Sequence, residues 1–302
     1  VVGWRSLEEF ILALEQRGEL LRVSHPVDVE LEAGCIADLL VKRNGPAVIF
    51  DQPRLGDGSI SRYPLAMNLF GTRDRTNLAL GVVEPKEIGE MMTGLMKPDI
   101  GGILRRPWTG LGLLRQGISM APRKVSRGNC QQVRMDNPDV TRLPIPTSWP
   151  QDGGPFMTLP LVVTSDPETG VHNLGMYRSQ VFGPDEVGLH WQKHKHGADH
   201  AEASEDRMPV AICLGGPPQV IFSAISPLPD NLSEYEFAGL LSGRRLKITK
   251  CLTNDLWVPA DCDFVIEGYT LPSERRMEGP FGDHFGHYSL EDEYPVMHVT
   301  AI

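Results

Sequence analysis

Apolar positions near the start of the chain recur with the spacing of one helical face. They are Leu7, Phe10, Ile11 and Leu14. Ser6 precedes this run and Glu9 follows three residues later, which is the pattern of a capping box. Gly18 stands where a helix would be expected to end. The pattern therefore predicts a helix from Ser6 to Gly18.

Short apolar runs and helical patterns alternate through the rest of the first hundred residues. Leu20–Val23 and Ala47–Phe50 are typical of strands, whereas Leu31–Lys42 and Ile88–Met96 have helical spacing. This alternation indicates an N-terminal α/β module. Residues 97–128 contain many Gly, Pro and Arg and few periodic signals, so we interpret them as a connector.

From about residue 130 the pattern changes to short β-branched runs separated by Gly, Pro and Asp turns. These runs are Leu159–Thr164, Val210–Leu214, Val220–Ile225, Leu246–Cys251, Phe264–Tyr269 and Val296–Ile302. Only Ser233–Leu241 has helical spacing there, with Ser233 as its N-cap. Several short strands bounded by turns predict a β-barrel or a β-sandwich. The predicted fold class is α+β, with an N-terminal α/β domain over residues 1–125 and a β-rich domain over residues 126–302.

Composition narrows the class of protein. The 302 residues are 41% hydrophobic and 23% charged, as in a soluble protein with a core, and the net charge of −10 without a basic run excludes nucleic-acid binding. No apolar run spans a membrane, and no signal peptide opens the chain. Five scattered cysteines without a C-x-x-C pair indicate reduced thiols. Because the chain starts at Val1 and stops at Ile302 within a β-like run, we expect both ends to be cut.

Two carboxylates near the C-terminal end flank a stretch rich in glycine. Glu278 and Asp283 are separated by Gly279, Pro280 and Gly282, among others. In an extended strand, side chains five residues apart point to opposite faces. A Gly-Pro turn folds the backbone back, so we expect both carboxylates to enter one space, with one of them held protonated. The alternative is an ordinary acidic turn in solvent.

A second cluster runs from His172 through Asn173 to Arg178 and continues at His190. Because a buried arginine is rare without a partner, we expect Arg178 to pair with a substrate carboxylate or with the two acids. The alternative is a surface arginine on an edge strand. The spacing of His190 and the histidine at 194 resembles a zincin, but Trp191 stands where that motif needs glutamate. We place the histidines at 194, 196 and 200 on a solvated loop.

A third cluster includes Glu234, at the start of the helix that Ser233 caps. The helix dipole favours a negative charge there, so Glu234 suits either a simple N-terminal charge or a metal ligand. An Asn amide, a Glu carboxylate and one imidazole would suit Mn²⁺ or Mg²⁺ better than zinc.

Several motifs in this order resemble the UbiD family of decarboxylases, which use prenylated FMN. They are residues 14–20, Asn68–Thr72, Asn173–Arg178, Leu232–Tyr235, Lys250–Asn254 and Glu278–His284. The resemblance covers nearly the whole chain and is closest to bacterial enzymes that decarboxylate 4-hydroxy-3-polyprenylbenzoate in ubiquinone-type quinone biosynthesis. It implies a carboxy-lyase whose β-rich domain is a flavin-binding split β-barrel.

The resemblance also implies a role for individual residues. Arg178 would hold the substrate carboxylate, Asp283 would deliver a proton after CO₂ leaves, and Glu278 would tune Asp283. The backbone near Ala224–Ser226 would line the same pocket. The implied metal ligands are Asn173, His190 and Glu234. The implied cofactor contacts are Met176, Tyr177, Arg178, His190, Trp191, Gln192, Lys195 and His196.

The resemblance further implies prenylated FMN and Mn²⁺ as cofactors, with a monovalent cation such as K⁺ as a further expectation. The implied partners are a small aromatic carboxylic acid as substrate, the flavin prenyltransferase that supplies the cofactor, and further copies of the chain in a homo-oligomer. The implied location is the cytoplasm, with peripheral association at the inner membrane as an extension. Family members continue into a C-terminal domain that helps to cover the pocket.

Two other functions remain open from the sequence. One is the same chemistry, in either direction, on small phenolic or α,β-unsaturated acids. The other is a flavin-binding module without catalysis of its own.

Overall fold

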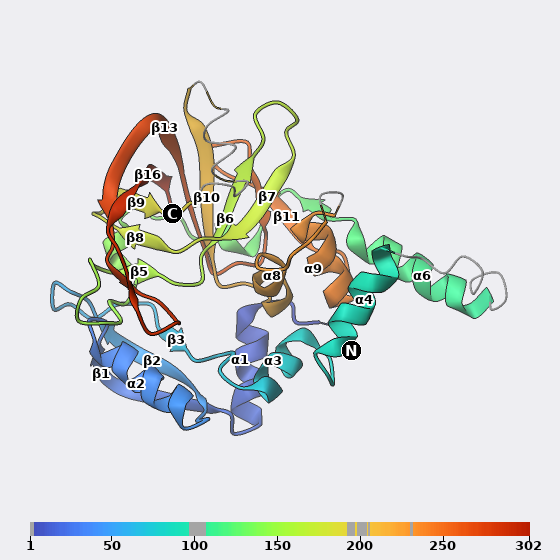
Figure 1. Cartoon of the computed structure of the whole chain (residues 1–302), viewed down its shortest axis with the longest axis horizontal. Helices are drawn as coiled ribbons and strands as arrows, with labels where there is room; N and C mark the ends of the chain where they lie inside the picture. The colour runs from blue at the N-terminus through green and yellow to red at the C-terminus, as the bar shows by residue number, and fades with distance from the viewer. Residues whose placement is uncertain (1–2, 97–106, 192–196, 198–203, 205, 230–231) are drawn as a thin grey trace.

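The computed structural model describes residues 3–96, 107–191, 197, 204, 206–229 and 232–302. Its N-terminal part holds a three-stranded sheet, in which β1 (Leu20–Asp28) runs parallel to β2 (Ala47–Arg54). β3 (Leu65–Met67) pairs with β2 in the antiparallel direction. The helix α2 (Glu32–Lys42) connects the two parallel strands, as a parallel pair requires. The predicted α/β module is therefore present (Figure 1).

The first helix, α1 (Leu7–Gln16), forms as its local sequence predicts. The hydroxyl of Ser6 accepts a hydrogen bond from the backbone N–H of Glu9. The carboxylate of Glu9 accepts from the N–H of Arg5, one residue earlier than in the predicted capping box. Leu7, Phe10 and Leu14 are buried on one face, so the apolar spacing sets how the helix packs.

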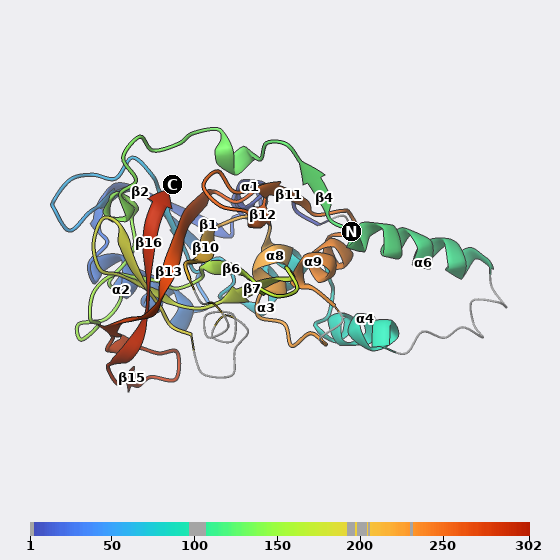
Figure 2. The same cartoon turned by 90° about the horizontal axis from the view of Figure 1, so that it is seen from above.

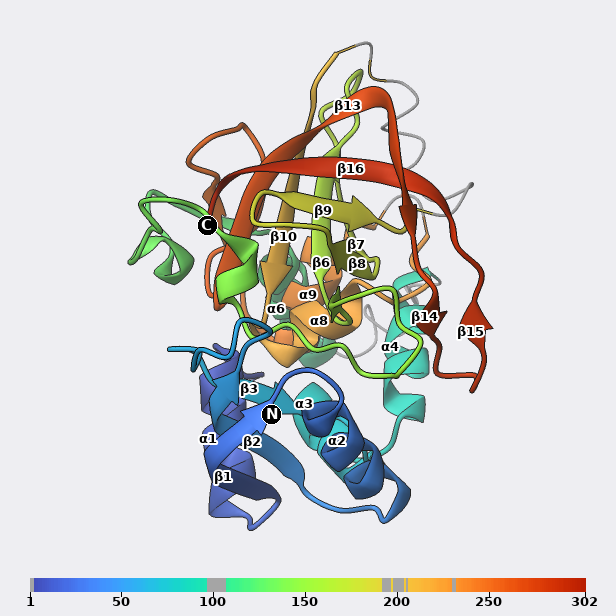
Figure 3. The same cartoon turned by 90° about the vertical axis from the view of Figure 1, so that its left-hand side faces the viewer.

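An eight-stranded sheet dominates the C-terminal part and curls into a half-barrel, over which its two longest strands arch (Figure 3). In spatial order the strands are β5 (Phe156–Met157), β8 (Ser179–Val181), β9 (Glu186–Leu189), β16 (Asp292–Ala301), β13 (Phe264–Glu278), β10 (Met208–Leu214), β6 (Leu161–Ser165) and β7 (His172–Met176). A smaller sheet joins β12 (Trp257–Pro259), β11 (Lys247–Lys250) and β4 (Arg123–Val125), and β14 (Phe281–Gly282) pairs with β15 (Tyr288–Ser289).

Both faces of the central strands are buried. Along β10, Ala211 and Cys213 belong to one apolar cluster, whereas Val210 and Ile212 belong to another. This division follows the two-residue period of a strand. The first cluster also contains the α1 face, including Phe10, so the N-terminal module and the curled sheet share a core.

Helices surround the lower end of the half-barrel (Figures 1 and 2). They are α3 (Arg73–Leu80), α4 (Lys86–Met96), α6 (Pro107–Met120), α8 (Pro218–Ser223) and α9 (Glu234–Ser242), with 3₁₀ turns at Asn129–Gln131 and Val140–Arg142. The predicted start of α9 is confirmed, because the Ser233 hydroxyl accepts from the N–H of Glu236. No described helix is long and apolar enough to cross a membrane.

Two predictions from the sequence were wrong. Residues 97–128 are not a simple connector, because they contain α6 and β4; α6 packs so closely on α9 that a side chain at Gly239 would meet the carbonyl oxygen of Ser119 at 2.2 Å. Val220–Ile225 is not a strand, because α8 spans Pro218–Ser223. A short, fully buried apolar run has no polar face, so periodicity alone does not separate a helix from a strand.

Candidate functional site

The carboxylate of Glu278 forms the centre of a buried ion-pair network at the end of β13. Arg178 donates from Nε to Oε1 at 2.9 Å and from Nη2 to Oε2 at 3.4 Å. His190 Nδ1 lies 2.7 Å from Oε2. The side chain of Glu278 is fully buried, and those of Arg178 and His190 are 12% and 15% exposed. The predicted pairing of Arg178 with an acid is confirmed, and the alternative of a surface arginine is wrong.

Burial opposes the ionised form of the Glu278 carboxyl. The hydrogen bonds and charges of His190 and Arg178 outweigh that effect and hold the pKa of Glu278 below its ordinary value. The expectation of a protonated acid is therefore wrong for Glu278. Because an ionised carboxylate only accepts hydrogen bonds, Nδ1 of His190 must be the protonated nitrogen.

Asp283 lies on the hairpin of β14 and β15, and its carboxylate has other partners. It accepts from the N–H of His284 at 2.6 Å and pairs with the ring of the same histidine. Its side chain is 36% exposed. Among the described residues Glu278 and Asp283 share no partner, and the expectation that both carboxylates enter one space stays a prediction. Glu278 ends a strand in the core, whereas Asp283 sits at the exposed end of a two-stranded hairpin.

Backbone contacts bring the motif around Arg178 next to the one around His190. The N–H of His190 donates to the carbonyl oxygen of Arg178 at 3.2 Å, and that of Met176 donates to the carbonyl oxygen of Ala224 at 3.3 Å. The structure therefore joins the end of β7, the residue after β9 and the end of α8. The Ala224 backbone thus lies beside Met176, while the expectation that Ala224–Ser226 lines the cofactor pocket stays a prediction.

Two aromatic residues of the predicted cofactor set flank this junction. The ring of Tyr177 lies over Gly175, where a Cβ would come within 2.3 Å of it, so position 175 has no room for a side chain. Trp191 is buried, and within the described part of the chain its indole N–H has no acceptor. A buried donor of this kind fits a ligand that carries acceptor oxygens, such as a flavin phosphate or ring carbonyl. Gln192, Lys195 and His196 lie outside the described residues.

The predicted metal ligands Asn173 and Glu234 lie on adjacent elements. Asn173 is buried in β7, and the next residue, Leu174, donates its N–H to the Glu234 carboxylate at 3.3 Å. Among the residues that the structure describes, no three His, Cys, Asp or Glu side chains gather as a metal site. The predicted ligand set contains two side chains of these types, His190 and Glu234, and the amide of Asn173. Its oxygen donors fit a hard cation, and His190 has the carboxylate partner typical of a metal-binding histidine.

Sequence reasoning missed Ser289 and Tyr294. The Ser289 hydroxyl accepts from Arg178 Nη2 at 3.0 Å, and the Tyr294 ring lies 4.3 Å from that of His190. Neither residue belongs to a recognisable motif. The only signal was the alternation of side chains along the terminal strands. It indicates which face of the sheet a residue lies on, but not which residue it contacts.

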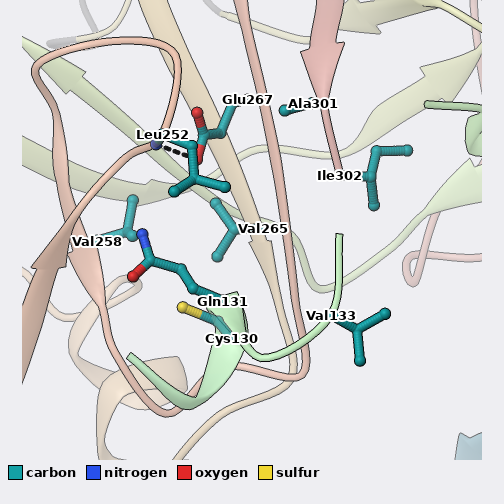
Figure 4. A pocket seen from close by; sticks show the side chains of 9 residues that line it. All are labelled: Cys130, Gln131, Val133, Leu252, Val258, Val265, Glu267, Ala301 and Ile302. Carbon is teal, nitrogen blue, oxygen red and sulfur yellow. Dashed lines mark hydrogen bonds between the residues drawn. The ribbon is translucent and has the colours of Figure 1, made fainter. Parts of the chain in front are cut away.

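A separate pocket lies near the start of β13, away from Arg178 (Figure 4). It is lined by Cys130, Gln131, Val133, Leu252, Val258, Val265, Glu267, Ala301 and Ile302. Its cavity of about 10 Å³ is at the lower limit for one water molecule. An aromatic acid or a flavin does not fit there, so the candidate site is the Glu278 network.

Comparisons with known proteins agree with this assignment. Residues 123–302 match the family model of the UbiD 3-octaprenyl-4-hydroxybenzoate carboxy-lyase Rift-related domain, and residues 11–93 match the N-terminal domain of the same family. An uncharacterised protein of Archaeoglobus fulgidus is 42% identical over 305 residues, which cover the whole of this chain.

Solved structures of similar shape include a UbiD-class enzyme and a vanillic acid decarboxylase. An evolved dimeric form of HmfF from Pelotomaculum thermopropionicum, in complex with prenylated FMN (prFMN), matches 99% of the chain with a TM-score of 0.84 and 27% identity. The vanillic acid decarboxylase of Sedimentibacter hydroxybenzoicus, in closed form, matches 99% with a TM-score of 0.84 and 30% identity. The chain spans 62% of the Archaeoglobus relative and 65% and 61% of these two structures.

Proposed function

The chain belongs to the UbiD family, and on that premise we propose that it is a carboxy-lyase that removes CO₂ from an aromatic carboxylic acid without oxidation. The observation that carries this proposal is the buried network of Glu278, Arg178 and His190. Burying three ionisable side chains is costly, and a structural role would be met by apolar residues at least as well. Functional sites are where such clusters concentrate.

Arg178 is the residue best suited to bind the substrate carboxylate. Nε and Nη2 are engaged by Glu278 and Ser289, and among the described residues Nη1 has no recorded acceptor. A guanidinium recognises a carboxylate through charge-assisted hydrogen bonds, so Nη1 is available to hold the acid. Glu278 keeps the guanidinium in place and neutralises it until the substrate arrives.

Decarboxylation breaks the bond between the ring carbon and the carboxylate, and the ring carbon takes up one proton in place of CO₂. When bound, prenylated FMN would supply the sink for the electron pair that this bond leaves behind. Asp283 would deliver the proton, with Glu278 tuning it. Met176, Tyr177, Arg178, His190 and Trp191 would contact the cofactor, with Gln192, Lys195 and His196. Asn173, His190 and Glu234 would hold Mn²⁺.

Two substrate classes follow from the comparisons. The description of the matching family model names 3-octaprenyl-4-hydroxybenzoate and so favours a 4-hydroxy-3-polyprenylbenzoate. Its decarboxylation in ubiquinone-type quinone biosynthesis is part of the same proposal. The similarity to a vanillic acid decarboxylase favours a small phenolic acid. Competing one prenylated benzoate against vanillate, with release of CO₂ from each as the measurement, separates the two classes.

The remaining expectations are part of the same proposal. They are a cytoplasmic homo-oligomer with peripheral association at the inner membrane, a flavin prenyltransferase as cofactor donor, K⁺ beside the Mn²⁺, and a division of the chain between residues 125 and 126. Native mass spectrometry of the purified protein tests the cofactor, the metal and the oligomer in one measurement.

The decisive variant is Arg178→Ala. We expect loss of CO₂ release with part of the cofactor still bound, because the substrate carboxylate loses its partner. Arg276→Ala is a matched control, since Arg276 also pairs with a glutamate, at 2.8 Å, and lies over a phenyl ring, but on the surface. Full activity in Arg178→Ala contradicts the proposal.

A flavin-binding module without catalysis is the alternative from another class. Its signature is an absorbance spectrum of bound, modified flavin in a protein that releases CO₂ from none of the candidate acids. Turnover of any acid by the same preparation excludes this alternative.

A further inference from the structure

Ser289, at the base of the β14–β15 hairpin, contacts the buried ion-pair network through its hydroxyl oxygen. The hydroxyl of Ser289 accepts from Arg178 Nη2 at 3.0 Å and from the backbone N–H of Phe281 at 3.2 Å. Phe281 and Ser289 are directly opposite each other in the hairpin ladder. Ser289 therefore connects the guanidinium to both strands of the hairpin that carries Asp283.

The guanidinium of Arg178 is fixed from three directions. Glu278 takes two of its N–H groups, Ser289 accepts from Nη2, and the ring of Phe281 lies 4.7 Å from its central carbon. Phe281 in turn packs on Phe156 of the half-barrel, with 4.7 Å between ring centroids. The contact from Nη2 to the carboxylate is long, at 3.4 Å, so the carboxylate alone holds the guanidinium firmly only at Nε. The hydroxyl and the ring define its position.

The hairpin is also attached to the rest of the protein by contacts that do not involve Ser289. Asp152 accepts from the N–H of Gly282 at 2.8 Å, and Gln180 accepts from that of Gly279 at 2.8 Å. The N–H of Gly153 donates to the carbonyl oxygen of Pro280 at 2.8 Å. Removing the Ser289 hydroxyl should therefore leave the hairpin folded and docked. The effect of that change on Arg178 is then measurable by itself.

We propose that Ser289 is a positioning residue, which holds the Arg178 guanidinium in place for the substrate carboxylate and couples it to the hairpin that carries Asp283. This inference rests on the proposed function, because it assigns Arg178 the role of carboxylate binder. A substrate that draws on Arg178 would act on the hairpin through this hydroxyl and the ring of Phe281. The group that binds the acid and the group proposed to protonate the product are thereby linked.

The test compares Ser289→Ala with Ser289→Thr, which keeps the hydroxyl, and with Leu290→Ala. Leu290 is the next residue and is 89% exposed, so it controls for a change in the hairpin itself. In Ser289→Ala we expect kcat/KM for the acid to fall about tenfold, mostly in kcat, because the carboxylate still binds but is misplaced. Threonine should restore most of the loss, and Leu290→Ala should match the wild type.

A second readout does not depend on catalysis. Exchange of the Arg178 Nη2–H with water, followed by ¹⁵N NMR, should become about tenfold faster in Ser289→Ala, since the hydrogen bond from Nη2 to the Ser289 hydroxyl is gone. The melting temperature should stay near that of the wild type. An unchanged exchange rate in folded Ser289→Ala overturns the inference, as does an equal increase in Ser289→Thr.

The two readouts separate failure of this inference from failure of the proposed function. If the wild type releases CO₂ from no acid, the proposed function fails, and the exchange of Arg178 Nη2–H still decides whether Ser289 positions the guanidinium. If the wild type is active but kcat, KM and exchange are the same in Ser289→Ala, only the role of Ser289 is wrong.

Discussion

Two glutamates on the same strand, β13, are buried for different reasons. Glu267, near the start of the strand, accepts from the backbone N–H groups of Leu252 and Thr253 at 2.7 and 2.6 Å and from the Thr253 hydroxyl at 2.8 Å. Glu278, at its end, accepts from the side chains of Arg178 and His190. Both carboxylates are less than 4% exposed, and Figure 3 shows the long strand that separates them.

The partners decide what each carboxylate does. Backbone N–H groups carry no net charge and do not move away from their loop, so Glu267 fastens the loop at Leu252 to the sheet. Side-chain cations exchange partners with a ligand, so Glu278 belongs to a site that responds to substrate. Burial alone therefore does not identify a functional carboxylate in this fold. A functional carboxylate is identified by the charge and the mobility of the groups that donate hydrogen bonds to it.

The largest expected effect comes from removing the charge of Glu278. In Glu278→Gln we expect kcat to fall by roughly 10²–10⁴-fold, because Arg178 and His190 lose the anion that organises them. The assay is CO₂ release from the preferred acid, normalised to bound flavin. Glu267→Gln is the matched control and should keep wild-type turnover per folded molecule. A similar loss of turnover in both variants would remove the distinction between the two glutamates.

Glu267 is expected to contribute to stability. Glu267→Gln should lower the free energy of unfolding by roughly 2 kcal/mol, since the amide cannot accept from all three donors and places an NH₂ group among them. Urea unfolding followed by circular dichroism measures the difference. A loss well below that in Glu267→Gln would show that the loop at Leu252 is held by other contacts.

Acid should weaken the protein through Glu278. Because the pKa of Glu278 is held below its ordinary value of 4.5, its ionised form stabilises the folded state above that value. This contribution is lost as the pH falls below 4.5, through the lower pKa of the folded state. Urea midpoints measured from about pH 6 to about pH 3 should fall less steeply in Glu278→Gln than in the wild type. Parallel curves for the two proteins would contradict the assignment.

The smallest expected effect is on the chemical reactivity of Cys130, which lines the pocket beside Glu267 near the start of β13. Burial raises the pKa of the Cys130 thiol to about 12, so its thiolate fraction is on the order of 10⁻⁴ at pH 8. Iodoacetamide should label the exposed Cys35 and spare Cys130 in the native protein. Peptide mass spectrometry measures the labelled fraction of Cys35 and of Cys130 in one sample. Rapid labelling of Cys130 would show that the pocket beside Glu267 opens in solution.

Local sequence predicted the elements whose signals are local. Each of these signals spans only a few neighbouring residues. They are the Ser6 cap and apolar face of α1, the Ser233 cap of α9 and the strand runs of the half-barrel. The helix α8 was misread because its apolar residues are buried on all sides, so no polar face shows the period. α6 was missed because its glycines and proline weaken the helical pattern.

The sequence by itself determined the α+β class and the family resemblance, since residue types and short-range spacing encode them. It left open whether Arg178 pairs with a substrate, pairs with an acid of the chain or lies on the surface. Only the tertiary structure decided that Glu278, not Asp283, is the buried partner and that Ser289 joins the hairpin to Arg178. Arg178 lies 100 residues from Glu278 and 111 from Ser289. Contacts over such separations arise from the curling of the sheet, which no local pattern specifies.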